Sequence, residues 1–222
     1  MLGAAAVGLL AWLASAALVR ATVQGETPAE RIACIYALAD KGAFGAAEAI
    51  GQAATTDPDP SVRRAAVTVL ARFSGPEVRS ALTSATRDDD ADVRASAAAT
   101  LGPGQDALAA DRLGELLAAD PEESVRVAAI SGLARNDTPN AIVHLLDAAE
   151  SNDRKEVRIR ALDAVYGKIK LHLERRRIRN QADWLDLVEY VKGFEQVQAA
   201  YRAAGRELKR HPEHLHADHV EK

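Results

Sequence analysis

Apolar and polar residues follow one phrase that returns every 31 to 32 residues along the chain. The phrase reads Val-Arg-x-x-Ala-x-x-x-Leu, and its apolar residues at i, i+4 and i+8 share one face of an α-helix. Four copies begin at Val62, Val93, Val125 and Val157, and a weaker copy begins at Glu30. Recurrence at this period indicates one supersecondary unit per repeat, which buries its apolar face only against its neighbours.

A helix breaker and a second apolar run follow each phrase. The breakers contain Gly or Pro, which end one helix and begin the next. Second helices are predicted over residues 44–54, 77–87, 106–118 and 140–150. Acidic residues precede each phrase and suit the N-cap and the helix dipole. Since no segment alternates with period two, we expect no sheet.

The longer phrase Asp-Pro-x-x-x-Val-Arg-x-x-Ala-x-x-x-Leu, as in residues 57–70 and 120–133, resembles the HEAT repeat, in the short bacterial form of phycobilisome lyases. The resemblance covers about residues 27–180. It implies an all-α, right-handed α-solenoid of about five helix pairs, assigned here to residues 29–180. It also implies that the repeat arginines form a structural ladder with nearby aspartates, with ligand binding as the alternative. These ladder arginines are Arg63, Arg94, Arg126 and Arg158.

Residues 2–19 carry no charged side chain and end at Arg20. A helix of this length spans roughly 27 Å, about the thickness of a bilayer core. We interpret residues 1–21 as a transmembrane anchor or signal-anchor, followed by a linker at 22–28. A cleaved signal peptide is an alternative, since residues 14–16 fit the small-x-small pattern, and a buried apolar helix is another. A single-pass protein with its repeats on the extracytoplasmic, periplasmic side is favoured over the cytoplasmic face that Arg20 and Arg31 would suggest.

Composition narrows the possible functions. Hydrophobic residues make up 48% of the chain and aromatic residues only 4%, and the formal net charge is −4. The single cysteine excludes an intrachain disulfide and a cysteine-based zinc site. Ten acidic and two basic residues lie in residues 88–123, whereas ten basic and three acidic residues lie in residues 154–179. Helix capping and a charged partner are the two explanations of this polarity.

The last part of the chain differs from the repeats. Residues 181–210 predict a long C-terminal helix that caps the stack or docks onto a partner. The candidate partner-binding residues are basic or aromatic: Arg175, Arg176, Arg177, Arg179, Trp184, Tyr190, Phe194 and Tyr201. Residues 211–222 predict a flexible, His-rich tail. Its weak candidates for metal ligation are His211, His214, His216 and His219.

No catalytic or cofactor-binding motif stands out, so we expect no enzyme and no cofactor or small-molecule substrate. The hypothesis is a membrane-anchored scaffold for protein–protein interaction that serves as an accessory subunit of a larger membrane complex. Its partners would be other subunits, and residues 2–19 would contact the membrane. A chromophore-lyase-like or chaperone-like maturation factor is the alternative. A nucleic-acid-binding solenoid is the third hypothesis, which the net negative charge disfavours.

Overall fold

The computed structural model describes residues 25–41 and 45–175 of the 222-residue chain, with side chains up to Lys168. These ranges contain nine α-helices. Their bounds are α2 (Pro28–Lys41), α3 (Ala46–Thr56), α4 (Pro60–Leu70), α5 (Pro76–Ala85), α6 (Ala91–Leu101), α7 (Ala107–Ala119), α8 (Glu123–Arg135), α9 (Pro139–Ser151) and α10 (Lys155–Arg175).

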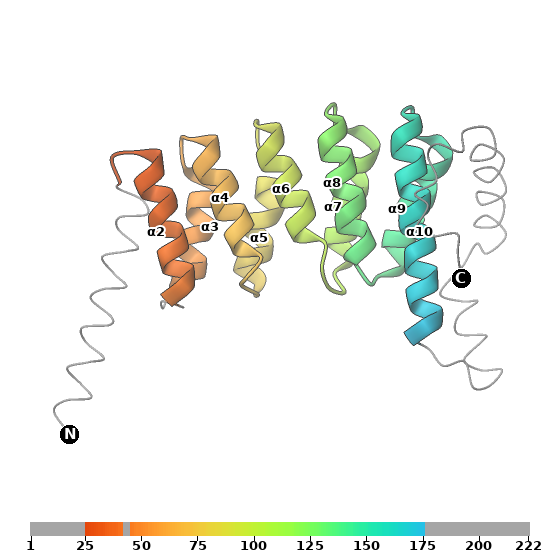
Figure 1. The fold of residues 1–222 in the computed structure, drawn as a ribbon, viewed down its shortest axis with the longest axis horizontal. Helices are drawn as coiled ribbons and strands as arrows, with labels where there is room; N and C mark the ends of the chain where they lie inside the picture. Colours follow the sequence, from red (N-terminus) through yellow and green to blue (C-terminus); the bar gives the residue numbers. More distant parts are fainter. Residues whose placement is uncertain (1–24, 42–44, 176–222) are drawn as a thin grey trace, which may run out of the picture.

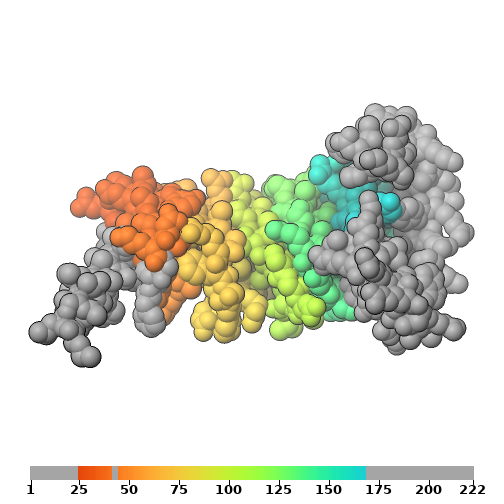
Figure 2. Space-filling model, turned by 60° about the horizontal axis from the view of Figure 1, so that its bottom comes forward, coloured from red at the N-terminus to blue at the C-terminus, as the bar shows by residue number. Residues whose placement is uncertain are grey.

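The helices stand side by side in a row from α2 to α10 (Figure 1). The even-numbered helices pack one upon the next and form one layer, while α3 packs on α5 and α7 on α9 in the second layer. Each odd-numbered helix also packs against the even-numbered helix that follows it. The described chain therefore holds four helix pairs and the first helix of a fifth, which succeed one another along the long axis (Figure 2).

Helix starts follow from local chemistry. The side chains of Asp59, Asp90 and Asp106 each accept a hydrogen bond from a backbone amide in the first turn of α4, α6 and α7. Such N-caps satisfy amide groups that have no partner within the helix. Proline occupies the first position of α4, α5 and α9, where its missing amide hydrogen costs nothing.

The core is built from small and medium side chains. In α4 the repeated phrase buries Val62, Ala66 and Leu70 completely. Backbones approach closely where α6 ends against α8: a Cβ added to Gly102 would lie 2.2 Å from the carbonyl oxygen of Gly132. Glycine is needed there because any side chain would push these two helices apart.

Within the described ranges the prediction of helices without a sheet is confirmed, and the only β-type pairing is an isolated bridge between Gly104 and Asn136. The second helices lie within about two residues of their predicted bounds. None of the described helices has the length and apolar composition to cross a bilayer. The predicted anchor at residues 2–19 and the predicted C-terminal helix at 181–210 lie outside the described residues.

Candidate functional site

A ladder of arginine–aspartate pairs ties together the two helices of each pair. Each arginine lies in the first turns of an even-numbered helix, and its aspartate lies just after the following odd-numbered helix. The arginine Nε and Nη2 donate to the two carboxylate oxygens. The Nε–oxygen distances are 2.7 Å for Arg31 and Asp57, 2.7 Å for Arg63 and Asp88, and 2.8 Å for Arg94 and Asp120. This two-pronged contact is the strongest geometry for a guanidinium and a carboxylate.

Asp57 and Asp88 also connect their own helix pair to the next. The carboxylate of Asp88 accepts a hydrogen bond from the backbone amide of Asp90, which forms the turn into α6. Its main-chain carbonyl accepts from Nη1 of Arg94, the next arginine of the ladder, at 2.9 Å. Asp57 makes the corresponding contacts with Asp59 and Arg63. One residue therefore joins two successive arginines, through its side chain and its main chain.

The ladder is largely shielded from water, and this shapes its electrostatics. The side chains of Arg94 and Asp120 are 13% and 4% exposed. Hydrogen bonds that the arginines donate to the aspartates raise the pKa of Arg31, Arg63 and Arg94 above the ordinary value. Burial alone would raise the pKa of Asp88, but hydrogen bonds from Arg63 and a backbone amide outweigh it and lower that pKa.

The fourth step of the ladder is different because Asn152 stands where the earlier steps have aspartate. Its Oδ1 accepts from the backbone amide of Arg154 at 3.0 Å, so the turn is kept. Its Nδ2 donates to the carbonyl oxygen of Leu117 at 3.1 Å. Arg126 lacks a two-pronged carboxylate partner: only its Nη1 reaches a carboxylate, that of Asp153 at 3.3 Å, and its Nε is buried without a hydrogen-bond partner.

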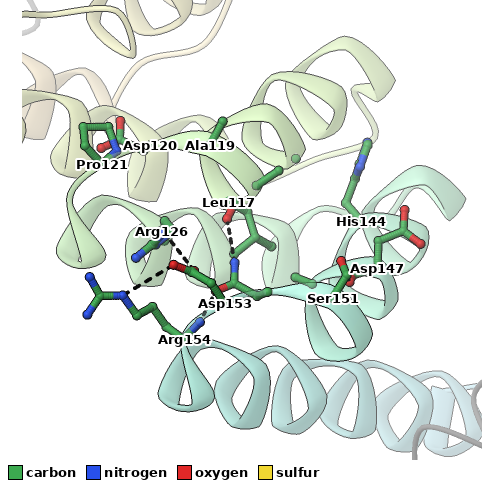
Figure 3. A pocket seen from close by; sticks show the side chains of 14 residues that line it. Leu117, Ala119, Asp120, Pro121, Arg126, His144, Asp147, Ser151, Asp153 and Arg154 are labelled. Atoms are coloured by element: carbon green, nitrogen blue, oxygen red, sulfur yellow. Dashed lines mark hydrogen bonds and ion pairs between the residues drawn. The ribbon is translucent and has the colours of Figure 1, made fainter.

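This open step borders a cleft of about 510 Å³. Figure 3 shows Arg126, Asp153 and Arg154 together on one side, and His144, Asp147 and Ser151 on the other. Leu117, Ala118 and Ala148 add apolar surface to the lining. The cleft therefore has a buried positive charge, that of Arg126, next to an apolar surface.

His144 is held at the far wall of the cleft by a small polar network. Its Nε2 lies 3.0 Å from Oδ1 of Asp111, which also accepts from Nδ2 of Asn140 at 2.8 Å. These two contacts lower the pKa of Asp111. The ring lies over Gly114, where an added Cβ would meet it at 2.4 Å. Only glycine at this position lets α7 and α9 bring the imidazole so close.

The structure places the four predicted ladder arginines along one series, but in three different situations. Arg63 and Arg94 hold an aspartate with two prongs, and Arg126 contacts Asp153 with one. Arg158 donates to the main-chain oxygen of Asn152 at 2.9 Å. Sequence reasoning left Arg31 out of the ladder and did not single out Asn152. The sequence signal for both is the residue 25 or 26 positions after each arginine, which is Asp57, Asp88, Asp120 and Asn152 in turn for Arg31, Arg63, Arg94 and Arg126.

The other predicted site residues fall at or beyond the limit of the described chain. Arg175 is the last residue of α10, and its side chain is not described. Arg176, Arg177, Arg179, Trp184, Tyr190, Phe194, Tyr201, His211, His214, His216 and His219 lie outside the described residues. Within the described part, no group of three or more His, Cys, Asp or Glu side chains is placed to hold a metal ion.

Comparison with known proteins supports the reading of the repeats. A search of curated proteins found no match to this chain. The family model for HEAT repeats matches residues 15–102 and again residues 81–166, which together make up more than half of the chain. The stacked helix pairs and the periodic Val-Arg phrase lie within the matched region. The chain therefore belongs to the HEAT-repeat family.

Proposed function

We propose that this protein is a membrane-anchored scaffold for protein–protein interaction, serving as an accessory subunit of a larger membrane complex. HEAT repeats in general mediate protein–protein interaction and are typically non-catalytic. The observation that carries the proposal is the row of helix pairs joined by the arginine–aspartate ladder. A stack with this connection presents an extended surface of fixed shape, on which many weak contacts add up.

The proposed attachment to a membrane rests on the apolar run at residues 2–19, which is free of charged side chains. A helix of that length matches a bilayer core. The linker that follows is short, since α2 begins at Pro28. Such a link would hold the repeats near the bilayer surface, on the extracytoplasmic side in our proposal. Partners would then be other subunits of the same complex.

The test is purification of the full-length chain from its own membranes in mild detergent, followed by mass spectrometry of the comigrating proteins. Stoichiometric membrane subunits are the expected result. A chain found alone would refute the accessory-subunit proposal. Capture of one apoprotein, without other subunits, would instead favour the maturation-factor alternative.

Attachment is tested separately by a double substitution, Leu9→Arg with Trp12→Arg. Two charges near the bilayer centre each oppose insertion by about 3 kcal/mol, so this variant should leave the membrane fraction. Leu9→Ala with Trp12→Phe keeps the segment apolar and serves as the matched control. Equal membrane retention of both variants would refute the anchor. A mature chain lacking residues 1–16 would show that the segment is a cleaved signal.

A further inference from the structure

The three complete steps of the ladder show what surrounds a guanidinium at this position of the fold. Arg31, Arg63 and Arg94 each place Nε and Nη2 on the two oxygens of a carboxylate. Arg126 occupies the same position in α8 and is the exception, because Asn152 offers no such carboxylate. We propose that Arg126 binds an acidic side chain of a partner protein, which completes the open step from outside. This inference rests on the proposed scaffold function and names the chemistry of its partner.

Asn152 cannot take the role of the missing aspartate by turning its amide. As placed, its oxygen accepts the turn hydrogen bond from Arg154, and its nitrogen donates to Leu117. Turning the amide would bring an N–H donor against the amide of Arg154 and an oxygen against the carbonyl of Leu117. Both present hydrogen bonds would be lost for one new contact to Arg126. The asparagine therefore keeps the turn and leaves the arginine open.

Arg126 is poorly satisfied by its present neighbours. The residue is only 6% exposed, and its Nε is a buried donor without an acceptor. Its one carboxylate contact, Nη1 to Asp153, is 3.3 Å long, and the Asp153 side chain is 70% exposed. An ion pair whose carboxylate is largely exposed and whose contact is long and single is weak and easily displaced. A buried charge that is only partly paired destabilises the fold. Binding of a partner's carboxylate to Arg126 would remove this destabilisation and is therefore favourable.

The surroundings favour a carboxylate over a phosphate. Asp120, Asp147 and Asp153 line the cleft beside Arg126 and Arg154, so the second negative charge of a phosphate would be repelled. The fork of a guanidinium also matches the two oxygens of one carboxylate, as in the earlier steps. Leu117 and Ala148 can cover the methylene groups of a glutamate. The volume of about 510 Å³ exceeds one side chain and suits several residues of an extended segment.

The test measures binding of a fluorescein-labelled hexapeptide with one central glutamate among five glutamines to the full-length chain in mild detergent, by fluorescence anisotropy. Hexaglutamine is the neutral control peptide. Asn152→Asp supplies the carboxylate from within the chain and should weaken binding of the glutamate peptide about tenfold or more, as should Arg126→Gln. Ser80→Asp adds the same charge at an exposed position outside the cleft, and Arg72→Gln removes an exposed arginine elsewhere. Both controls should change binding by less than about threefold.

Several outcomes would overturn the inference. These are equal binding of hexaglutamine, unchanged binding in Asn152→Asp, equal losses in Arg72→Gln and Arg126→Gln, or displacement of the peptide by an equal concentration of inorganic phosphate. Asn152→Asp keeps the result decisive if Arg126→Gln does not fold. If the peptide fails to bind while membrane subunits still comigrate, this inference is wrong and the scaffold proposal stands. If the peptide binds at Arg126 but nothing comigrates, the scaffold proposal fails instead.

Discussion

The substitution Asp120→Asn would convert the third step of the ladder into a copy of the fourth. An asparagine keeps the turn hydrogen bond from the backbone amide of Glu122. It loses the charge-assisted contacts from Arg94, whose Nε and Nη2 lie 2.8 and 3.1 Å from the carboxylate oxygens. Arg94 retains its hydrogen bonds to the carbonyl oxygens of Asp88 and Asp89, so its charge is still partly compensated.

The expected loss of stability follows from this partial rescue. Removing one partner of a fully buried ion pair costs roughly 3–5 kcal/mol. The remaining carbonyl contacts and the 13% exposure of the Arg94 side chain reduce this to about 2–3 kcal/mol. For a chain of this size, that loss lowers Tm by roughly 4–12 °C. The reverse change, Asn152→Asp, gains a partner for Arg126 but loses the bond to Leu117, so it should add only about 1 kcal/mol.

Thermal unfolding of the full chain in detergent, followed by far-UV circular dichroism, measures both shifts. Asp40→Asn is the matched control, because Asp40 pairs with Arg72 at 2.7 Å but its side chain is 69% exposed. We expect that control to change stability by less than about 1 kcal/mol. The reasoning would be refuted if Asp120→Asn melted with the wild type, or if Asn152→Asp melted below it.

Three further predictions concern close packing and pH. Gly102→Ala should destabilise the fold by roughly 3 kcal/mol, because its Cβ would lie 2.2 Å from the carbonyl oxygen of Gly132. Gly167→Ala is the control, because a Cβ there would meet no atom within 4 Å. Equal Tm values for the two variants would contradict the packing argument. The stability that the depressed pKa of Asp88 contributes is present above about pH 4 and is lost as pH falls through its folded value, so urea denaturation should show wild type and Asp88→Asn converging in acid. Burial lowers the pKa of Lys168 below 10.5, so the folded state is less stable while this amine is charged. The stability of the wild type relative to Lys168→Met should therefore rise as the pH rises towards 10.5. A stability difference that does not change with pH would refute this prediction.

Much of the fold was predictable because residues close together in the sequence determine where each helix begins and which face it buries. The apolar slots of the phrase at Val62, Ala66 and Leu70 are the residues that the structure buries completely. Capping aspartates and prolines set the helix starts, so α5 and α9 begin one residue from their predicted positions. These signals act within one or two turns of helix, which a single sequence displays.

The candidate site was harder to predict because it depends on contacts between distant residues. Arg126 and Asn152 are 26 positions apart, and their relation is meaningful only once the end of α9 is seen beside the start of α8. The contact of His144 with Gly114 likewise needs the packing of α7 on α9. The Asp-to-Asn change at the repeated position was visible, but nothing in the sequence alone identified that position as the arginine's partner.

The double role of the ladder aspartates restricts how such a chain can gain or lose length. Asp88 serves Arg63 with its side chain and Arg94 with its main chain, so neither pair is complete within its own repeat. A duplicated or deleted segment leaves the series intact only if it spans a whole period of 31 or 32 residues. An insertion inside α5 would instead shift the aspartate away from one arginine while leaving it attached to the other. Insertion or deletion of whole repeat units is therefore the change of length that we expect the ladder to tolerate.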